Sequence, residues 1–265
     1  MKTTHTVAII SNKGGVGKTT TAVNTAARLS QLGYYVLVVD LDKQCNLTRT
    51  FLQNTPSFTI YEALMGTGPK PPKYRINNHL TLVPASPLLF GIEGQLRSRS
   101  GSNQDLVRCL ERLLGPEEGK YDYIIIDSSA VDNILTISAL AFVHDIVFVM
   151  RPEQYSLEAV KDLFLYIRQL QQAYNQKLRL AGILITGMFW DSVGHVKGEE
   201  YIRNWLPKYV LKSVIRNSRP LYTSILEHKD VFTYAPTSNG AQDYEQFVNE
   251  LIEIIKTKDA KKENL

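Results

Sequence analysis

The segment Lys13-Gly14-Gly15-Val16-Gly17-Lys18-Thr19-Thr20 constrains this chain more than any other. The apolar run Thr6–Ile10 precedes it, and helix-forming residues follow it from Thr21 to Leu32. Glycines between a buried strand and a helix let successive backbone N–H groups point at one place, which makes an anion nest at a helix N-terminus. Lys18 can reach the β- and γ-phosphates of a nucleotide, and the Thr19 hydroxyl can hold Mg²⁺. The segment therefore predicts a phosphate-binding loop.

The loop departs from the general pattern G-x-x-x-x-G-K-[ST] at one position, because Asn12 stands where that pattern has Gly. The form present is K-G-G-x-G-K-T-T, with a second lysine, Lys13, ahead of the glycines. Cradling phosphates within one subunit does not require that lysine. Lys13 is therefore either a solvated loop residue or a residue with a role that one subunit cannot fill.

Length and composition are those of a soluble enzyme-sized domain. The 265 residues, 44% hydrophobic and 21% charged, suit one domain over 1–265 with a flexible basic tail from about 257 to 265. Two cysteines, Cys45 and Cys109, are too few for a disulfide framework or an iron–sulfur set and fit a reducing cytoplasm. The first strand follows Met1–His5 directly, so no signal peptide is expected, and no apolar run is long enough to span a membrane.

Apolar runs alternate with segments of helical spacing along the chain. This alternation predicts an α/β fold of the P-loop NTPase type, with a mostly parallel central sheet covered on both faces. Strands are expected at 6–10, 34–39, 80–85, 121–127, 145–150, 181–186 and 210–215. Helices are expected at 21–32, 60–65, 88–97, 104–114, 156–174, 199–206, 219–227 and 238–256.

Three acids stand at the carboxyl ends of predicted buried strands. Asp40 and Asp42 follow the run Tyr34–Val39, and Asp127 ends the run Tyr121–Ile126 in a Walker B pattern. The carboxyl ends of parallel strands form the ligand edge of an open sheet, so these acids are expected beside the loop. A Walker B aspartate accepts a hydrogen bond from a Mg²⁺-bound water. Asp40 and Asp42 have the alternative of capping a helix near Asn46.

With these motifs in this order, the chain resembles the deviant-Walker-A ATPases of the ParA/MinD group, and most closely the short, Soj-type ParA proteins. The resemblance covers nearly the whole chain. Asn12–Thr21 matches the K-G-G-x-G-K-T-T block, and Val38–Asn46 resembles the D-x-D-P-Q-G-N block. Tyr234–Tyr244 resembles the ParA ending Y-x-P-x-S-x-G-A-x-x-Y, which separates ParA-like members from more distant relatives.

The resemblance implies ATP and Mg²⁺ as cofactors and assigns roles residue by residue. Lys13 would be the signature lysine that reaches the partner subunit's nucleotide, and Asp42 would orient the attacking water; with Lys18, these are the catalytic residues. Thr19, Asp40 and Asp127 would serve the hydrated Mg²⁺. The nucleotide would contact the loop and, at its adenine, two later residues: Lys13, Gly14, Gly15, Val16, Gly17, Lys18, Thr19, Thr20, Thr186 and Pro236.

The resemblance also implies partners. These are a homodimer formed with ATP, DNA bound without sequence preference, and a ParB-like centromere-binding protein or a cargo adaptor, in a cytoplasmic, nucleoid-associated protein. The net charge of +4 is mild, but basic residues thicken in the C-terminal half. The expected DNA contacts are Arg203, Lys212, Arg216, Arg219 and Lys229. Interspersed acids leave a merely solvated charged face as the alternative.

Departures from the family pattern lie beside the expected site. Lys43 replaces a proline, Cys45 replaces a glycine, and Ser128-Ser129-Ala130 replaces a proline-containing turn. We expect these departures to affect the rate of hydrolysis and the coupling to a partner protein more than nucleotide binding. The alternatives to DNA partition are a related ATPase that positions a protein cargo or organelle on the nucleoid, a MinD-like membrane-associated ATPase with an amphipathic last helix, and a small-molecule amide ligase.

Overall fold

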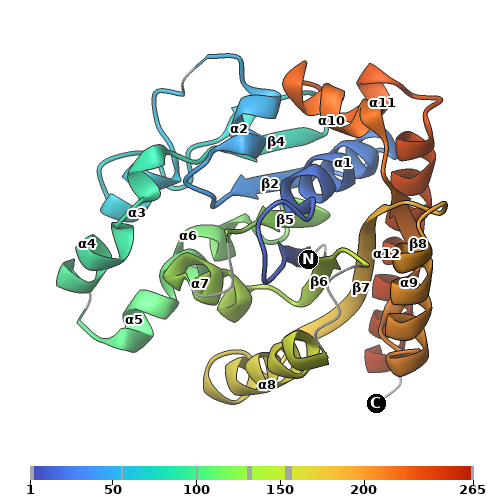
Figure 1. Ribbon diagram of the computed structural model, residues 1–265. Coiled ribbons are helices and arrows are strands. Elements are labelled where there is room, and N and C mark those ends of the chain that lie inside the picture. The colour runs from blue at the N-terminus through green and yellow to red at the C-terminus, as the bar shows by residue number, and fades with distance from the viewer. Residues whose placement is uncertain (1–2, 55, 100, 130–132, 153–156, 264–265) are drawn as a thin grey trace.

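An eight-stranded sheet lies at the centre of the computed structural model, which describes residues 3–54, 56–99, 101–129, 133–152 and 157–263 (Figure 1). Its order from edge to edge is β3-β4-β2-β5-β1-β6-β7-β8. Every neighbouring pair is parallel except β3 and β4, which are antiparallel. The strands are β1 (His5–Ile10), β2 (Val36–Asp40), β3 (Tyr74–Arg75), β4 (Leu80–Val83), β5 (Tyr123–Asp127), β6 (Asp145–Met150), β7 (Arg179–Met188) and β8 (Val210–Arg216).

Helices cover both faces of this sheet, which confirms the predicted α/β fold. The α-helices are α1 (Lys18–Gln31), α2 (Asn46–Phe51), α3 (Ile60–Met65), α4 (Ile92–Arg99), α5 (Asn103–Val107), α6 (Cys109–Leu114), α7 (Ile134–Phe142), α8 (Leu157–Ala173), α9 (Val193–Trp205), α10 (Arg219–Leu226), α11 (Val231–Tyr234) and α12 (Asn239–Glu263). Two 3₁₀ turns, Pro87–Leu89 and Gly115–Glu117, complete the described elements.

The pleat of β1 divides the core into two layers. Val7 and Ile9 face a cluster that includes residues of α1, α10, α11 and α12, whereas Ala8 and Ile10 face a cluster built largely from α3 to α8. Successive side chains of a strand point to opposite faces, so a strand covered on both faces must be apolar throughout. This requirement explains why the interiors of the central strands read as continuous apolar runs, with polar residues such as Asp40 and Asp127 at their ends.

The predicted helix at 104–114 is wrong as one element, because the structure breaks it at Arg108 into α5 and α6. The hydroxyl of Ser138, from α7, donates to the carbonyl of Val107 and accepts from the N–H of Leu110 at 3.2 Å. A side chain inserted into the backbone ladder breaks a helix. Leucines at helical spacing did not reveal the break, because its cause lies on another helix.

Other boundaries differ from the sequence-based ones by a few residues. Helix α1 begins at Lys18 rather than at Thr21, inside the glycine-rich segment. The segment expected to be helical over 88–97 divides into a 3₁₀ turn and α4, with Gly91 between them at a φ of 75°. Helix α12 continues to Glu263, into the segment for which a flexible tail is expected.

Two buried contacts tie α1 to the C-terminal third of the chain. The hydroxyls of Thr21 and Tyr244 lie 3.0 Å apart. The buried amide of Asn24 donates to the carbonyl of Thr20 at 2.8 Å and accepts from the N–H of Val231 at 2.8 Å. Because buried polar groups are costly when left unpaired, these bonds fix α11 and α12 against α1, the helix that starts at the glycine-rich segment.

The close packing of β7 against β8 gives a test of the fold. A Cβ added at Gly182 in β7 would lie 2.2 Å from Cδ2 of Leu211 in β8. We expect Gly182→Ala to lower the free energy of unfolding by about 1–3 kcal/mol through this overlap, as measured by urea denaturation. Gly94→Ala is the control, because a Cβ there, on exposed α4, meets nothing within 4 Å. An unchanged midpoint for Gly182→Ala would contradict the described packing.

Candidate nucleotide-binding site

The glycine-rich segment connects β1 to α1 with its backbone bent around an open centre. Gly15 and Gly17 have φ values of 74° and 94°, which side chains disfavour, and a Cβ added at Gly14 or Gly15 would meet nothing within 4 Å. Gly17 caps α1 without any side-chain bond, so the first N–H groups of the helix remain open to an anion. The buried Lys18 donates from Nζ to the carbonyl of Lys13 at 3.3 Å. This geometry is that of the predicted phosphate cradle.

Asp40 and Asp127 lie opposite each other in register at the carboxyl ends of β2 and β5. Both are fully buried. Asp40 accepts three hydrogen bonds: from the N–H of Asp42 at 3.0 Å, and from the N–H and hydroxyl of Thr48 at 2.8 and 2.7 Å. Burial nevertheless raises the pKa of Asp40 to about 6. Asp40, which is predicted to bind the hydrated Mg²⁺, therefore also anchors the first turn of α2.

Asp127 differs from Asp40 in the hydrogen bonds that its carboxylate accepts. Neither of its carboxylate oxygens has a hydrogen-bond partner among the described residues. Burial, and then the charge of Asp40, raise the pKa of Asp127 well above its usual range, against the opposing influence of Thr19 and Lys18. An uncompensated buried carboxylate beside a threonine hydroxyl fits a hydrated Mg²⁺, which binds oxygen ligands and keeps several waters. Thr19, Asp127 and Asp40 are the residues that would hold it.

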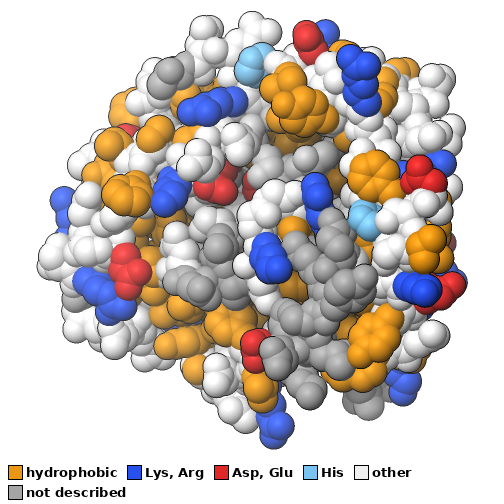
Figure 2. Space-filling model, in the orientation of Figure 1, with side chains coloured by type: hydrophobic (Ala, Val, Ile, Leu, Met, Phe, Trp, Pro, Cys, Tyr) orange, Lys and Arg blue, Asp and Glu red, His pale blue; other side chains and the backbone are white. Residues whose placement is uncertain are grey.

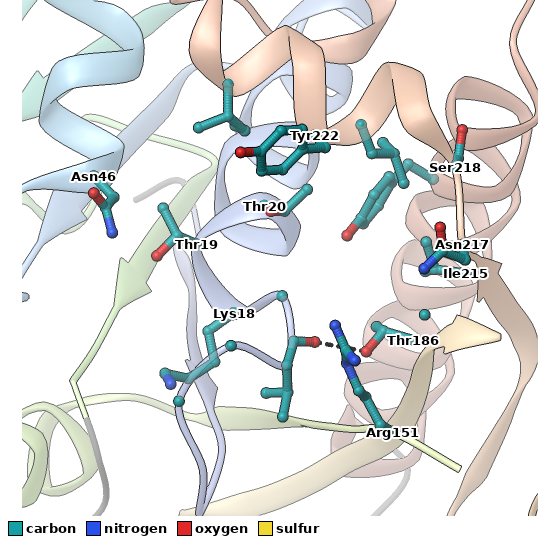
Figure 3. A pocket seen from close by; sticks show the side chains of 18 of the residues that line it. Lys18, Thr19, Thr20, Asn46, Arg151, Thr186, Ile215, Asn217, Ser218 and Tyr222 are labelled. Carbon is teal, nitrogen blue, oxygen red and sulfur yellow. Dashed lines mark hydrogen bonds between the residues drawn. The ribbon is translucent and has the colours of Figure 1, made fainter. Parts of the chain in front are cut away.

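A cavity of about 780 Å³ opens above the loop (Figure 3). Gly14 to Thr20 form its floor, and Asp42, Gln44 and Asn46 line one end. At the other end lie residues at or just after the carboxyl ends of β6, β7 and β8, together with residues of α10 and one of α12. These residues are Arg151, Thr186, Gly187, Ile215, Arg216, Asn217, Ser218, Leu221, Tyr222, Ile225, Leu226 and Tyr244.

Asp42 lies at the cavity, and its predicted role in orienting water stays a prediction. It is half-buried, lines the cavity and accepts from the N–H of Gln44 at 2.9 Å. Thr186 also lines the cavity, as predicted, and its hydroxyl donates to the carbonyl of Val16 at 2.6 Å (Figure 3). Its proton is therefore already engaged in tying β7 to the loop. The role of Thr186 at adenine stays a prediction.

Two predicted nucleotide contacts are not brought to this cavity. Lys13 is exposed, and Pro236 is exposed in the segment between α11 and α12; neither is among the lining residues. For Lys13 this agrees with a role outside its own subunit. The position of Pro236 leaves its predicted contact with adenine untested.

Sequence reasoning missed Arg151 and Asn217. Each directly follows a parallel strand, at the same edge of the sheet as the loop. The rule that ligands bind at the carboxyl ends of such strands was applied to the acids, and it would have found both residues if it had been applied to every strand end.

The five residues expected to contact DNA fall into two groups. Arg216 forms a two-pronged ion pair with the buried Asp243, and Arg203 pairs with Glu199 and donates to the carbonyl of Leu211. The other three, Lys212, Arg219 and Lys229, are exposed. On the face drawn in Figure 2, basic side chains are scattered among acidic and apolar ones and do not form one continuous patch.

Comparisons with known proteins agree with this geometry. A family model described as an AAA domain matches residues 4–180. The chromosome partitioning protein ParA of Myxococcus xanthus is 33% identical over 93% of this chain and 87% of its own length. This chain belongs to the ParA/Soj family of partitioning ATPases. The predicted family and the predicted ATPase class are therefore confirmed.

Further relatives support the assignment. The chromosome-partitioning ATPase Soj of Thermus thermophilus is 32% identical over 93% of this ParA/Soj chain and 94% of its own length. A structure of cobyrinic acid a,c-diamide synthase from Mycobacterium smegmatis, with bound ADP and magnesium, is 28% identical and matches with a TM-score of 0.80 over 96% of each chain. Among the helices that the structure describes, none combines the length and the apolarity needed to cross a bilayer.

The uncompensated carboxylate of Asp127 gives a test that is independent of hydrolysis. A carboxyl whose pKa is raised by folding destabilises the folded state increasingly as pH rises above the unfolded value of about 4. We expect Asp127→Asn, without Mg²⁺ or nucleotide, to be more stable than the wild type at pH 8 and nearly equal to it at pH 4. Urea denaturation at both pH values measures the difference.

The matched control is Asp122→Asn, because Asp122 is a half-buried acid at the opposite end of β5. It makes the same chemical change outside the candidate site, so its effect is subtracted at each pH. A stability difference for Asp127→Asn that stays constant from pH 4 to pH 8 would show that the Asp127 carboxyl is not strained by burial.

Proposed function

We propose that this chain is a switch ATPase: it dimerises with ATP, binds DNA without sequence preference, and partitions plasmid or chromosomal DNA when a partner protein stimulates hydrolysis. Its substrate is ATP and its metal is Mg²⁺. The ADP and magnesium bound in the similar Mycobacterium structure support both ligands. The observation that carries the proposal is a complete phosphate cradle joined to an exposed Lys13 that does not line its own cavity.

Hydrolysis needs positioning and charge neutralisation more than covalent chemistry. The open N–H groups of the loop and Lys18 bind the phosphates, and Asp42 orients the attacking water from the rim of the cavity. When bound, Mg²⁺ neutralises charge on the phosphate oxygens. Thr19 and Asp127 would hold it from the floor of the site.

Lys13 adds the charge that one subunit does not supply. Its carbonyl accepts from Lys18, while no salt bridge of its ammonium occurs within the described residues. An exposed lysine beside an anion site reaches a second nucleotide when two loaded protomers meet face to face. The positive charge then arrives only in the dimer, so hydrolysis is coupled to dimerisation.

Replacement of Lys13 tests this coupling. We expect Lys13→Gln to bind ADP as the wild type does, to remain monomeric with ATP and Mg²⁺, and to lose about 100-fold or more of its turnover, the loss typical of one transition-state donor. Analytical ultracentrifugation and phosphate release measure the two effects. Lys229→Gln, an equal charge loss at an exposed site outside the cavity, should leave both unchanged. A dimer of Lys13→Gln that turns over normally would refute the proposal.

Replacement of Asp42 separates dimerisation from hydrolysis. Asp42 lines the cavity, and within the described residues no hydrogen bond joins its side chain to the phosphate-binding loop. Asp42→Ala should therefore dimerise with ATP and fail to hydrolyse it. Sedimentation with and without ATP checks this expectation, and the locked form then serves to capture partners. A centromere-binding protein on that form indicates DNA segregation, and a cargo adaptor indicates positioning on the nucleoid. A monomer in both conditions, or unaltered turnover, argues against the switch.

Of the five candidates, we propose DNA contact only for the three exposed residues, Lys212, Arg219 and Lys229. Replacing Arg216 would leave the buried Asp243 without its partner, so a loss of binding in that variant would not distinguish contact from damage. We expect Lys212→Glu/Arg219→Glu to weaken ATP-dependent retention on DNA strongly and to lower the slope of log affinity against log salt by about 1.8 per subunit, or about 3.6 for the proposed dimer. Filter retention at several salt concentrations measures both.

Lys70→Glu/Lys177→Glu is the control for DNA binding, because it changes net charge equally at exposed positions outside the proposed surface. Equal losses of DNA retention in both double variants would show that binding depends only on net charge.

The membrane alternative has less support, since the apolar residues of α12 that an anchor would need, Phe247, Leu251 and Ile255, are fully buried.

A further inference from the structure

The side of the cavity formed by α10 differs chemically from the floor formed by the loop. The floor offers open N–H groups and Lys18 to phosphates, whereas the residues that α10 contributes are apolar or aromatic. They are Leu221, Tyr222, Ile225 and Leu226, whose spacing places them on one side of the helix. A phosphate-binding floor beside such a wall fits a ligand that carries phosphates at one end and a flat, weakly polar group at the other.

Contacts near both ends of α10 hold this side of the helix toward the cavity. Leu221 is buried against the start of α12, where a Cβ added at Gly240 would lie 2.5 Å from the Leu221 Cγ. Just beyond the other end of α10, His228 bonds through Nδ1 to the carbonyl of Arg49 in α2 at 2.5 Å. The wall is therefore fixed to its neighbours before a ligand binds.

Tyr222 is the aromatic residue of this wall. In Figure 3 its ring projects from α10 into the cavity and is drawn above Thr20, which belongs to the first turn of α1. The residue is 70% exposed, so the protein itself leaves most of the ring uncovered. Bases stack on aromatic rings of this kind, because both partners present flat π faces.

The order of the lining residues directs the base toward this wall. Asp42 lies at the end of the cavity where the metal and the γ-phosphate belong, and α10 lies at the other end. A nucleotide whose phosphates follow the loop therefore carries its base toward Tyr222. We propose that the ring of Tyr222 stacks on the adenine base and holds it against α10. The inference rests on the proposed nucleotide site.

The two residues predicted from the sequence to contact adenine do not supply such a stacking surface. The hydroxyl of Thr186 already donates to the carbonyl of Val16 at 2.6 Å, and Pro236 does not line the cavity. Among the described residues that do line it, the other aromatic side chain is Tyr244, which is fully buried and lies 3.0 Å from the Thr21 hydroxyl through its own. Tyr222 is therefore the ring that a base can reach.

Removal of the ring separates stacking from the phosphate contacts. We expect Tyr222→Ala to weaken ADP binding by about tenfold, the size of one lost base stack, and to leave binding of inorganic pyrophosphate, which has no base, unchanged. Tyr222→Phe should bind ADP as the wild type does, because stacking uses the ring and not the hydroxyl. Titration calorimetry with Mg²⁺ measures the ADP constants, and competition against ADP measures those of pyrophosphate. Because Tyr222 is exposed, these changes leave no void in the core.

Two further variants make the result specific. Tyr201→Ala, the matched control at a tyrosine that is 46% exposed on α9 and outside the cavity, should leave both constants unchanged. Tyr222→Trp should show fluorescence quenching by ADP, beyond any change in the wild type, and none by pyrophosphate, because only a base stacks on the added indole.

The inference is overturned if Tyr222→Ala binds ADP as tightly as the wild type, if it weakens ADP and pyrophosphate equally, or if ADP does not quench the added indole. Unchanged ADP binding together with lost dimerisation on ATP would assign Tyr222 to the contact between protomers instead. Failure of the wild type to bind ADP would refute the proposed nucleotide site itself.

Discussion

Two carboxylates buried side by side carry a large cost of desolvation, and the site is arranged around them. Asp40 and Asp127 are register neighbours on adjacent parallel strands. Asp40 is stabilised by three donors, whereas Asp127 has none among the described residues. A buried charge without a partner destabilises a fold unless it is neutralised or meets a cation. The energy of metal and nucleotide binding is therefore partly the relief of a cost that the fold already carries.

Hydrogen bonds connect the elements that surround this site to α1 and α2. Asn24 links α1 to the start of α11, and Tyr244 links it to α12. His228, between α10 and α11, bonds through Nδ1 to the carbonyl of Arg49 in α2 at 2.5 Å. The segment of α10 and α11 thus contacts both α1, which starts at the glycine-rich segment, and α2, which follows Asp42. Tyr222 and Leu226 of this segment line the cavity and are exposed.

The sequence predicted the parts of the molecule that depend on local chemistry. Glycines that need positive φ, apolar strands and acids at strand ends are each specified by neighbouring residues, so the glycine-rich turn and the sheet were predicted correctly, and the predicted acids lie at the same edge of the sheet. The break between α5 and α6 was not, because the hydroxyl of Ser138 comes from a distant helix. Arg216 is predicted to contact DNA from its charge and from the family resemblance, and only the fold reveals the buried Asp243 that pairs with it. Periodicity and composition do not predict contacts between segments that are far apart in the sequence.

The departures from the family pattern beside Asp42 are explained by the same kind of contact. Cys45 adopts a φ of 54°, a conformation that suits the glycine it replaces and that costs another residue about 1–2 kcal/mol. Burial raises the pKa of its thiol to about 11, so Cys45 stays protonated and is not a nucleophile.

Specific contacts hold this loop where the family relies on glycine and proline. The Cys45 thiol donates to the carbonyl of Lys43 at 3.4 Å, and the Lys43 ammonium lies 4.6 Å from the centre of the Phe90 ring. A segment held by these contacts has less freedom to move than a glycine-containing one. In the proposed mechanism they restrict the segment beside the water-orienting Asp42, so the step that remains to be controlled is the arrival of Lys13 from a second protomer.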